Sequence, residues 1–369
     1  MEETTRLLLE RVSAALSDNA SDWLALPRPS ARIHVEVFSE RPRSVMLRGS
    51  LGQDVGSPRV MVKIRREQPD TAGRQNRPRL RSGTPSAAEL TRLEFDALVR
   101  IHDSISASEP GLATVRPLAV LEDINAIVME YVEQPTLRKV VLAYSRFAGV
   151  RTPRRDIDEI WRRSGRWLRV FQAAVPADQP VRQADRGEIL GQIGRYQTFL
   201  ASRVGAATVD PVVTRAQEMV HNHLPEELPL APGHGDYAPR NMFVFSDDRL
   251  AVFDPLPRWR VPEYEDLCRL LIGLRLMGVQ LHSHGAAYRA SQIETWESAA
   301  LHGYYGDDVP WDRVRSYQML ILLDKWAALV DTAHRGIRSR VRIASIRLAS
   351  RYVRSQADRI YALVGCGPG

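Results

Sequence analysis

One short segment constrains the fold of this chain more than any other. Residues 234–241 read H-G-D-Y-A-P-R-N, so Asp236 and Asn241 stand five positions apart in a loop. Two short apolar runs follow, and the second ends at Asp254, thirteen positions beyond Asn241. One carboxylate can orient and deprotonate a hydroxyl, while an amide oxygen and a second carboxylate hold Mg²⁺ against phosphate groups. The order and spacing of these residues predict a site for phosphoryl transfer.

The rest of the chain divides into a β-rich part and a helical part. After a helical pattern at 4–17, alternating apolar residues predict strands at 32–38, 44–48 and 59–64. A basic loop at 65–86, a helix from Ser86 to Ile101 and strands at 114–121 and 125–131 complete the first part. Amphipathic patterns then predict helices at 155–175, 184–203, 209–223 and from 263 onward. We therefore expect an α+β fold with a small β-rich N-lobe over 1–132 and a large, mainly helical C-lobe over 133–369.

These features together resemble the aminoglycoside phosphotransferase family, which has the protein-kinase-like fold and includes choline, homoserine and sugar kinases. The family's loop reads roughly H-G-D-x-x-x-x-N, a variant of the kinase loop H-R-D-x-x-x-x-N. An apolar strand ending in Asp and a segment D-x-x-x-D-L follow it. The matching pieces here are 234–241, 252–255 (V-F-D-P) and 262–267 (P-E-Y-E-D-L). The resemblance implies a bilobal kinase-like fold and an ATP-dependent phosphotransferase that uses Mg²⁺.

The resemblance also implies a role for each residue of the loop region. Asp236 is the expected catalytic base, whose task is to accept a hydrogen bond from the acceptor hydroxyl and align it. Asn241 and Asp254 are the expected metal ligands. His234 and Asp266 are expected to support the loop rather than to exchange protons. For Asp266, an ordinary acid at a helix N-terminus is the alternative interpretation.

The nucleotide is expected to bind to the N-lobe. Lys63 ends the alternating strand V-M-V-K, much like V-A-I-K in kinases, and is the predicted phosphate-binding lysine. Its predicted partner is Glu94 on the following helix, with Glu89 as the alternative. The strand V-M-E-Y-V at 128–132 predicts the hinge that holds the base, with binding residues Met129, Glu130 and Val132. ATP is the expected donor, and GTP is the alternative.

The acceptor is predicted to be a small molecule with a hydroxyl group. Only twelve positions separate Asp254 from Asp266, which leaves no room for the long segment that a protein kinase uses for its peptide. Arg258, Trp259 and Arg260 follow the metal-binding Asp, and arginines beside an aromatic ring favour a carboxylate, phosphate or sugar-phosphate group. We expect a sugar or glycoconjugate. A kinase that modifies an antibiotic and a non-catalytic nucleotide-binding scaffold or sensor are the alternatives.

The composition of the chain limits which partners it is expected to bind and where in the cell it is expected to lie. The formal net charge is +7, carried mostly by arginine, and this suits a polyanionic ligand. No nucleic-acid-binding motif accompanies the charge, so no nucleic acid partner is expected. The segment 335–359 holds eight arginines interleaved with apolar residues, which suggests peripheral contact with an anionic membrane or polyanion, with a helix packed on the lobe as the alternative. An acidic N-terminus and the lack of a long apolar run predict a cytoplasmic protein.

Overall fold

The computed structural model describes residues 2–24, 33–51, 58–67, 78, 85–148, 156–334 and 340–365. The chain forms two compact units. Unit 1 comprises Met1–Thr71, Gly83–Gln134 and Ala251–Leu256, and unit 2 comprises Ala72–Ser82, Pro135–Leu250 and Pro257–Gly369. Most of the predicted basic loop at 65–86 lies outside the described residues, as does 335–339 of the arginine-rich segment.

Unit 1 is built on a five-stranded antiparallel sheet with the strand order β1-β2-β3-β6-β5. The five strands are β1 (Ile33–Arg41), β2 (Ser44–Leu51), β3 (Pro58–Arg65), β5 (Pro117–Leu121) and β6 (Ala126–Glu130). The remaining elements are α1 (Glu2–Trp23), α2 (Ala87–Ser108), β4 (Leu112–Thr114) and the short helix η1 (Glu122–Ile124). The predicted helices and strands of this part are present, except that the strand predicted at 114–121 is divided between β4, which ends at Thr114, and β5. Only α1 and α2 extend well beyond their predicted ends.

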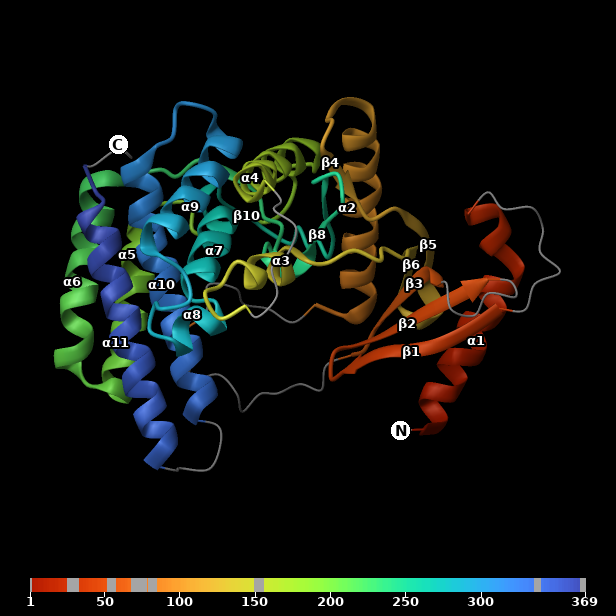
Figure 1. Cartoon of the computed structure of the whole chain (residues 1–369), viewed down its shortest axis with the longest axis horizontal. Coiled ribbons are helices and arrows are strands. Elements are labelled where there is room, and N and C mark those ends of the chain that lie inside the picture. Colours follow the sequence, from red (N-terminus) through yellow and green to blue (C-terminus); the bar gives the residue numbers. More distant parts are fainter. Residues whose placement is uncertain are drawn as a thin grey trace. The chain divides into compact units, whose positions relative to one another are not determined.

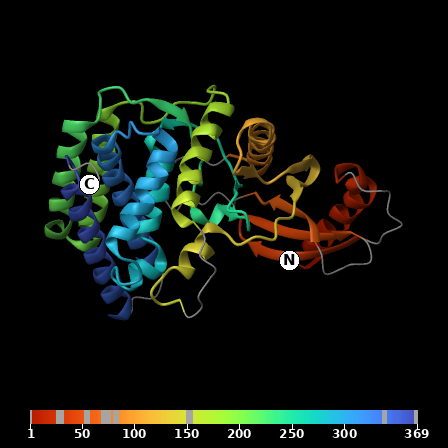
Figure 2. The same cartoon turned by 45° about the horizontal axis from the view of Figure 1, so that its top comes forward.

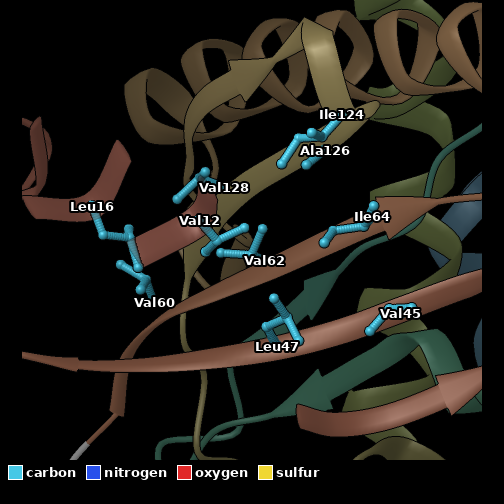
Figure 3. Packing of buried hydrophobic residues seen from close by; sticks show 10 residues of the cluster. All are labelled: Val12, Leu16, Val45, Leu47, Val60, Val62, Ile64, Ile124, Ala126 and Val128. Carbon is cyan, nitrogen blue, oxygen red and sulfur yellow. The ribbon is translucent and has the colours of Figure 1, made fainter. Parts of the chain in front are cut away.

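One face of this sheet carries the apolar core of unit 1 (Figure 3). Successive side chains of a strand point to opposite faces, so Val60, Val62 and Ile64 of β3 share one face. Val12 and Leu16 of α1 pack against them, and every member of this cluster is less than a tenth exposed. The alternation places Lys63 and Arg65 on the opposite face of β3 from the apolar core.

The helix α2 begins where the sequence predicts and ends later. The Ser86 hydroxyl accepts a hydrogen bond from the Glu89 amide at 3.1 Å, which caps the helix as expected. The helix continues past Ile101 because Ile105 extends the apolar stripe and is buried. It presents the carboxylate of Glu94, only 1% exposed, to the side chain of Lys63.

Unit 2 is mainly helical (Figures 1 and 2). Its helices are α3 (Leu137–Ala143), α4 (Ile157–Ala174), α5 (Arg186–Val204), α6 (Ala206–His223), α7 (Tyr264–Arg275), α8 (Gly278–His282), α9 (Ala290–Tyr305), α10 (Trp311–His334) and α11 (Arg340–Ala362). Its short elements are β7 (Leu230–Pro232), η2 (Pro239–Asn241), β8 (Met242–Val244) and β10 (Arg260–Pro262). β9 (Leu250–Val252) leads into the Ala251–Leu256 segment of unit 1. β7 pairs antiparallel with β10, and α10 packs with α5, α6, α7 and α11. The predicted α+β architecture is confirmed.

Two glycines let α4 and α9 approach closely. A Cβ atom on Gly165 would lie 1.8 Å from the Ala300 carbonyl oxygen, and one on Gly303 would lie 1.9 Å from the Arg162 carbonyl oxygen. No side chain fits at either position unless the helices move apart. Trp161 of α4 stacks on Trp296 of α9 next to this contact, with ring centroids 6.3 Å apart.

The helix α11 packs on the other helices of unit 2 along one face. Val353, Ala357 and Ile360 are fully buried, while Arg347 and Arg351 are exposed on the other face. Contact of this exposed face with a membrane or polyanion stays a prediction. None of the described helices combines the length and the apolar character that a membrane-spanning segment needs.

Candidate active site

In unit 1, an ion cluster forms around Lys63. The Lys63 Nζ atom donates to both carboxylate oxygens of Glu94, each at 2.8 Å, and to Oδ1 of Asp254 at 2.5 Å. Glu94 is therefore the acid that pairs with Lys63, and Glu89 lies exposed one turn away. The part that this pair plays toward a phosphate stays a prediction.

Arg65 is a member of this cluster that the sequence analysis did not single out. Its guanidinium pairs with Glu94 and lies 3.5 Å from Oδ1 of Asp254. Two cations and two carboxylates therefore face one another in a largely buried place, and their charges balance. Arg65 stands two residues after Lys63 on the same face of β3, but this spacing alone does not single it out among the many arginines of the chain.

Asp254 adopts an unusual backbone conformation. Its φ angle is +63°, in the left-handed region that residues other than glycine seldom occupy. Pro255 follows directly and further restricts the backbone of Asp254. Residues held in such conformations cluster at functional sites, where surrounding contacts fix them. Here the contacts with Lys63 and Arg65 hold the Asp254 carboxylate in place.

The predicted hinge residues lie at the end of β6. Met129 is 5% exposed and pairs with Met61 across the sheet, while Glu130 ends the strand with an exposed side chain. The Glu130 amide donates to the Arg116 carbonyl at 2.9 Å, and Val132 follows half-buried. Base recognition by Met129, Glu130 and Val132 stays a prediction.

In unit 2, the loop at 234–241 holds Asp236 through its own residues. Gly235 has a φ angle of +88°, so the turn before Asp236 requires a residue without a Cβ atom. The Asn241 Nδ2 atom donates to the Asp236 carbonyl and to its Oδ2 atom, both at 2.9 Å. Arg240 pairs with the Oδ1 atom. Both carboxylate oxygens of Asp236 thus accept hydrogen bonds from the loop.

His234 and Asp266 anchor the start of this loop. Both are fully buried. The Asp266 carboxylate accepts from the His234 amide, and His234 Nδ1 accepts from the Asp236 amide at 3.3 Å. The ring of His234 lies among Trp167, Phe171 and Tyr237. These contacts are of the kind that a supporting role requires, and they lie on the buried side of the loop.

Tyr237 ties the same loop to α4, which the sequence analysis did not foresee. Its hydroxyl donates to the Ser164 carbonyl, one residue before Gly165. Burial, with a smaller contribution from the charge of Asp266, raises the pKa of Tyr237 well above its ordinary value of 10.0. The hydroxyl therefore stays protonated and remains a donor at physiological pH.

A pocket of about 210 Å³ opens beside Asp236 within unit 2. The loop, α3, α7, α10 and the segment around α8 supply its walls. Its charged lining residues are Arg138, Asp236, Arg240, Arg269 and Lys325. Among the described residues that line it, Asp236 is the only carboxylate, so the pocket suits a ligand of negative charge.

The predicted acceptor residues Arg258, Trp259 and Arg260 do not line this pocket. The Arg258 guanidinium lies over the Trp259 ring, 5.7 Å from its centroid. Arg260 belongs to β10, where its amide donates to the Pro180 carbonyl and its carbonyl accepts from the Arg182 amide. A role for these three residues in acceptor binding stays a prediction.

Solved structures of phosphotransferases share the fold of this chain. The aminoglycoside phosphotransferase APH(4)-Ia, bound to AMP-PNP and hygromycin B, has a TM-score of 0.53 at 12% identity and covers 92% of this chain and 96% of its own. A structure from Ralstonia eutropha described as a putative aminoglycoside phosphotransferase has a TM-score of 0.53 at 12% identity, with 94% and 98% covered. Spectinomycin phosphotransferase, bound to ADP and spectinomycin, has a TM-score of 0.51 at 13% identity, with 89% and 93% covered.

The sequence comparison then identifies the family. Residues 71–255 match the sequence profile of the phosphotransferase enzyme family, known as APH, and this match spans half of the chain. The chain belongs to this family and is a phosphotransferase, as the sequence predicts. No match was found among curated protein sequences.

Proposed function

We propose that this protein transfers the γ-phosphate of ATP to a hydroxyl group of a small molecule, with a sugar or glycoconjugate as the preferred acceptor. One observation carries the proposal: the Asp236 carboxylate, fixed by Asn241, lies in the wall of a pocket that can hold a small molecule. ATP is the proposed donor, and GTP is the alternative.

Asp236 acts on the acceptor. Its carboxylate accepts a hydrogen bond from the acceptor hydroxyl and points the oxygen lone pair toward the γ-phosphorus. The hydroxyl oxygen forms a bond to phosphorus while the bond from phosphorus to the β–γ bridging oxygen breaks. ADP leaves with that electron pair, and the hydroxyl proton passes to Asp236. Positioning of this kind, together with electrostatic stabilisation of the transferred phosphate, accounts for almost all of the catalysis in phosphoryl transfer.

The cluster around Lys63 acts on the nucleotide. Glu94 holds the Lys63 ammonium group in place from α2, so that Lys63 can bind phosphate oxygens as kinase lysines do. Arg65 adds a second cation on the same face of β3. Phosphate oxygens would take over part of the bonding that Asp254 now provides to these two cations.

The two residues proposed to bind the metal, Asn241 and Asp254, offer side-chain oxygen atoms that suit Mg²⁺. This ion prefers carboxylate and amide oxygens and usually keeps several of its ligands from water and phosphate. Asp254 offers a carboxylate, and Asn241 commits its Nδ2 atom to the loop, which leaves its carbonyl oxygen for a metal. When bound, Mg²⁺ neutralises charge that develops on the phosphate oxygens. Asp254 and Asn241 would each supply one oxygen ligand to the ion.

An antibiotic is the second candidate acceptor. Two of the structures with the same fold hold hygromycin B or spectinomycin in their complexes. Those proteins are only 12% and 13% identical to this chain, so hygromycin B and spectinomycin are candidate acceptors to be tested in the assay.

The test is phosphate transfer from labelled ATP and Mg²⁺ to a panel of sugars, nucleosides, amino alcohols and antibiotics. We expect a labelled product with the wild-type protein and a loss of at least a hundredfold with Asp236→Asn, since general bases typically contribute a factor of about 10² to 10⁴. Equal activity in the variant would refute the role of Asp236. Nucleotide binding without hydrolysis or transfer would favour the alternative of a non-catalytic sensor.

A further inference from the structure

The pocket beside Asp236 contains more positive charge than catalysis requires. Arg269 is already committed to the fold, because it pairs with Glu265 and Asp324, each at 3.0 Å. Arg138 on α3 and Arg240 in η2 are different, since both side chains are largely exposed and both residues line the pocket. Their charges are therefore available to a ligand.

Arg240 pairs with Oδ1 of Asp236, the oxygen that would accept the hydrogen bond from the acceptor hydroxyl. Asn241 donates to Oδ2 of Asp236, and Arg240 pairs with Oδ1, so an arriving hydroxyl finds both oxygens engaged. The pair of Arg240 and Asp236 is solvent-accessible, with side-chain exposures of 52% and 38%. Such exposed pairs are weak and exchange partners readily. A ligand with its own anionic group can draw Arg240 away from Asp236.

Arg138 can complete the binding of such a group. It follows Leu137 at the start of α3, and its side chain lines the pocket. Its side chain is exposed, so its charge can reach a ligand in the pocket. The guanidinium group of each arginine is a planar array of donors, and it matches a carboxylate or phosphate better than the ammonium group of a lysine does.

We propose that the acceptor carries a carboxylate or phosphate group, and that this anion binds Arg138 and Arg240 and thereby releases Oδ1 of Asp236 for the hydroxyl. The inference rests on the proposed function and narrows its substrate class. Arg240 then has two effects. It binds an anionic acceptor, and it restrains Asp236 when the acceptor is neutral.

The first experiment compares matched acceptors. Transfer from labelled ATP is measured with glycerol and glycerol 3-phosphate, and with glucose, glucose 6-phosphate and glucuronate. We expect the anionic members to have a kcat/KM at least tenfold above that of their neutral partners. We expect Arg240→Gln to lower kcat/KM for the anions at least tenfold and to raise kcat for the neutral acceptors. Opposite effects on the two classes are not expected from a purely structural change.

Two neighbouring residues provide matched controls. Lys139 is an exposed cation beside Arg138 on α3 and does not line the pocket. Arg249 pairs with Asp247 in an exposed local pair much like that of Arg240 and Asp236. Arg138→Gln should raise KM for the anions at least tenfold, whereas Lys139→Gln and Arg249→Gln should leave it unchanged. Arg240→Lys should restore part of the loss.

A binding experiment separates this inference from the proposed function. Glucose 6-phosphate, glucuronate and glucose are titrated calorimetrically into the full chain with saturating AMP-PNP and Mg²⁺, so that the nucleotide site is occupied. Binding of both anions that is weakened in Arg138→Gln and not in Lys139→Gln supports the inference even if no acceptor is phosphorylated. Equal affinity for glucose and the anions, or equal effects of both variants, would overturn it. ATP turnover that depends on Asp236 would still uphold the proposed function in that case.

Discussion

At the scale of single residues, Glu94 links both cations of the cluster around Lys63. Its carboxylate is buried and accepts from Lys63 through both oxygens and from Arg65 through one. Asp254 is the second carboxylate near these cations. Removing one member of a balanced buried cluster leaves an uncompensated charge, and this costs about 3–5 kcal/mol in measured cases.

We expect Glu94→Gln to lower the free energy of unfolding by about 3 kcal/mol and to weaken AMP-PNP binding about tenfold, a difference of about 1.4 kcal/mol. Chemical denaturation and titration calorimetry measure the two effects. Glu89→Gln is the matched control, because Glu89 is exposed on the same helix. An equal effect of both variants would show that the pairing of Lys63 with Glu94 is not what supports nucleotide binding.

The same cluster shows how far sequence can predict a site. The pattern of β3 and the position of the following helix single out Lys63 and favour Glu94, because both belong to short local motifs. Arg65 could not be chosen among so many arginines from its local sequence alone. Its role depends on the approach of Asp254, which is distant in the chain and held in a left-handed conformation.

At the scale of elements, the contact between α4 and α9 supports the loop at 234–241. Gly165 lies against the backbone of α9, and Ser164 beside it accepts the hydrogen bond from Tyr237. The amphipathic pattern of 155–175 predicts α4 closely, since the helix spans Ile157–Ala174. Helices were also predicted from 263 onward, and α9 is one of them. Its pairing with α4 was not predictable, because complementarity between distant helices leaves no local periodic signal.

We expect Gly165→Ala to destabilise the protein by about 1–3 kcal/mol, the usual cost of overpacking, or more since the clash is with backbone. It should also reduce phosphate transfer, because α4 carries the carbonyl that holds Tyr237. Calorimetric unfolding and the transfer assay measure these effects. Gly194→Ala on α5 is the control, since a Cβ atom there meets nothing within 4 Å and should stabilise by about 0.5–1 kcal/mol. A neutral Gly165→Ala variant would contradict the close approach of the helices.

At the scale of the whole molecule, the positions of the charged residues say more about ligand binding than the net charge does. The sequence predicts a basic protein for a polyanionic ligand, but many arginines are used internally. Glu297 of α9 is fully buried and accepts from Arg275 at 2.6 Å and from Arg315 at 2.9 Å. These pairings between α7, α9 and α10 join residues far apart in sequence, so net charge alone could not reveal them.

The buried Glu297 cluster also predicts how stability depends on pH. Burial by itself would raise the pKa of Glu297, but the charges and hydrogen bonds of Arg275 and Arg315 outweigh it and lower the pKa below 4.5. A carboxyl with a depressed pKa in the folded state stabilises that state above the unfolded pKa and loses this contribution as the pH falls through the folded pKa. The free energy of unfolding should therefore decline as the pH drops below about 4.5.

Glu297→Gln isolates this contribution, because it leaves two buried arginines without a carboxylate. We expect a loss of about 3–5 kcal/mol at pH 7, and the difference from wild type should narrow as the pH is lowered from 4.5 to 3. Urea unfolding at a series of pH values measures it. Glu294→Gln serves as the control on the same helix, since Glu294 pairs with Arg359 in a partly exposed place. A difference between wild type and Glu297→Gln that stays constant with pH would mean that the Glu297 carboxyl does not titrate with unfolding, and the cluster would then stabilise through packing instead of charge.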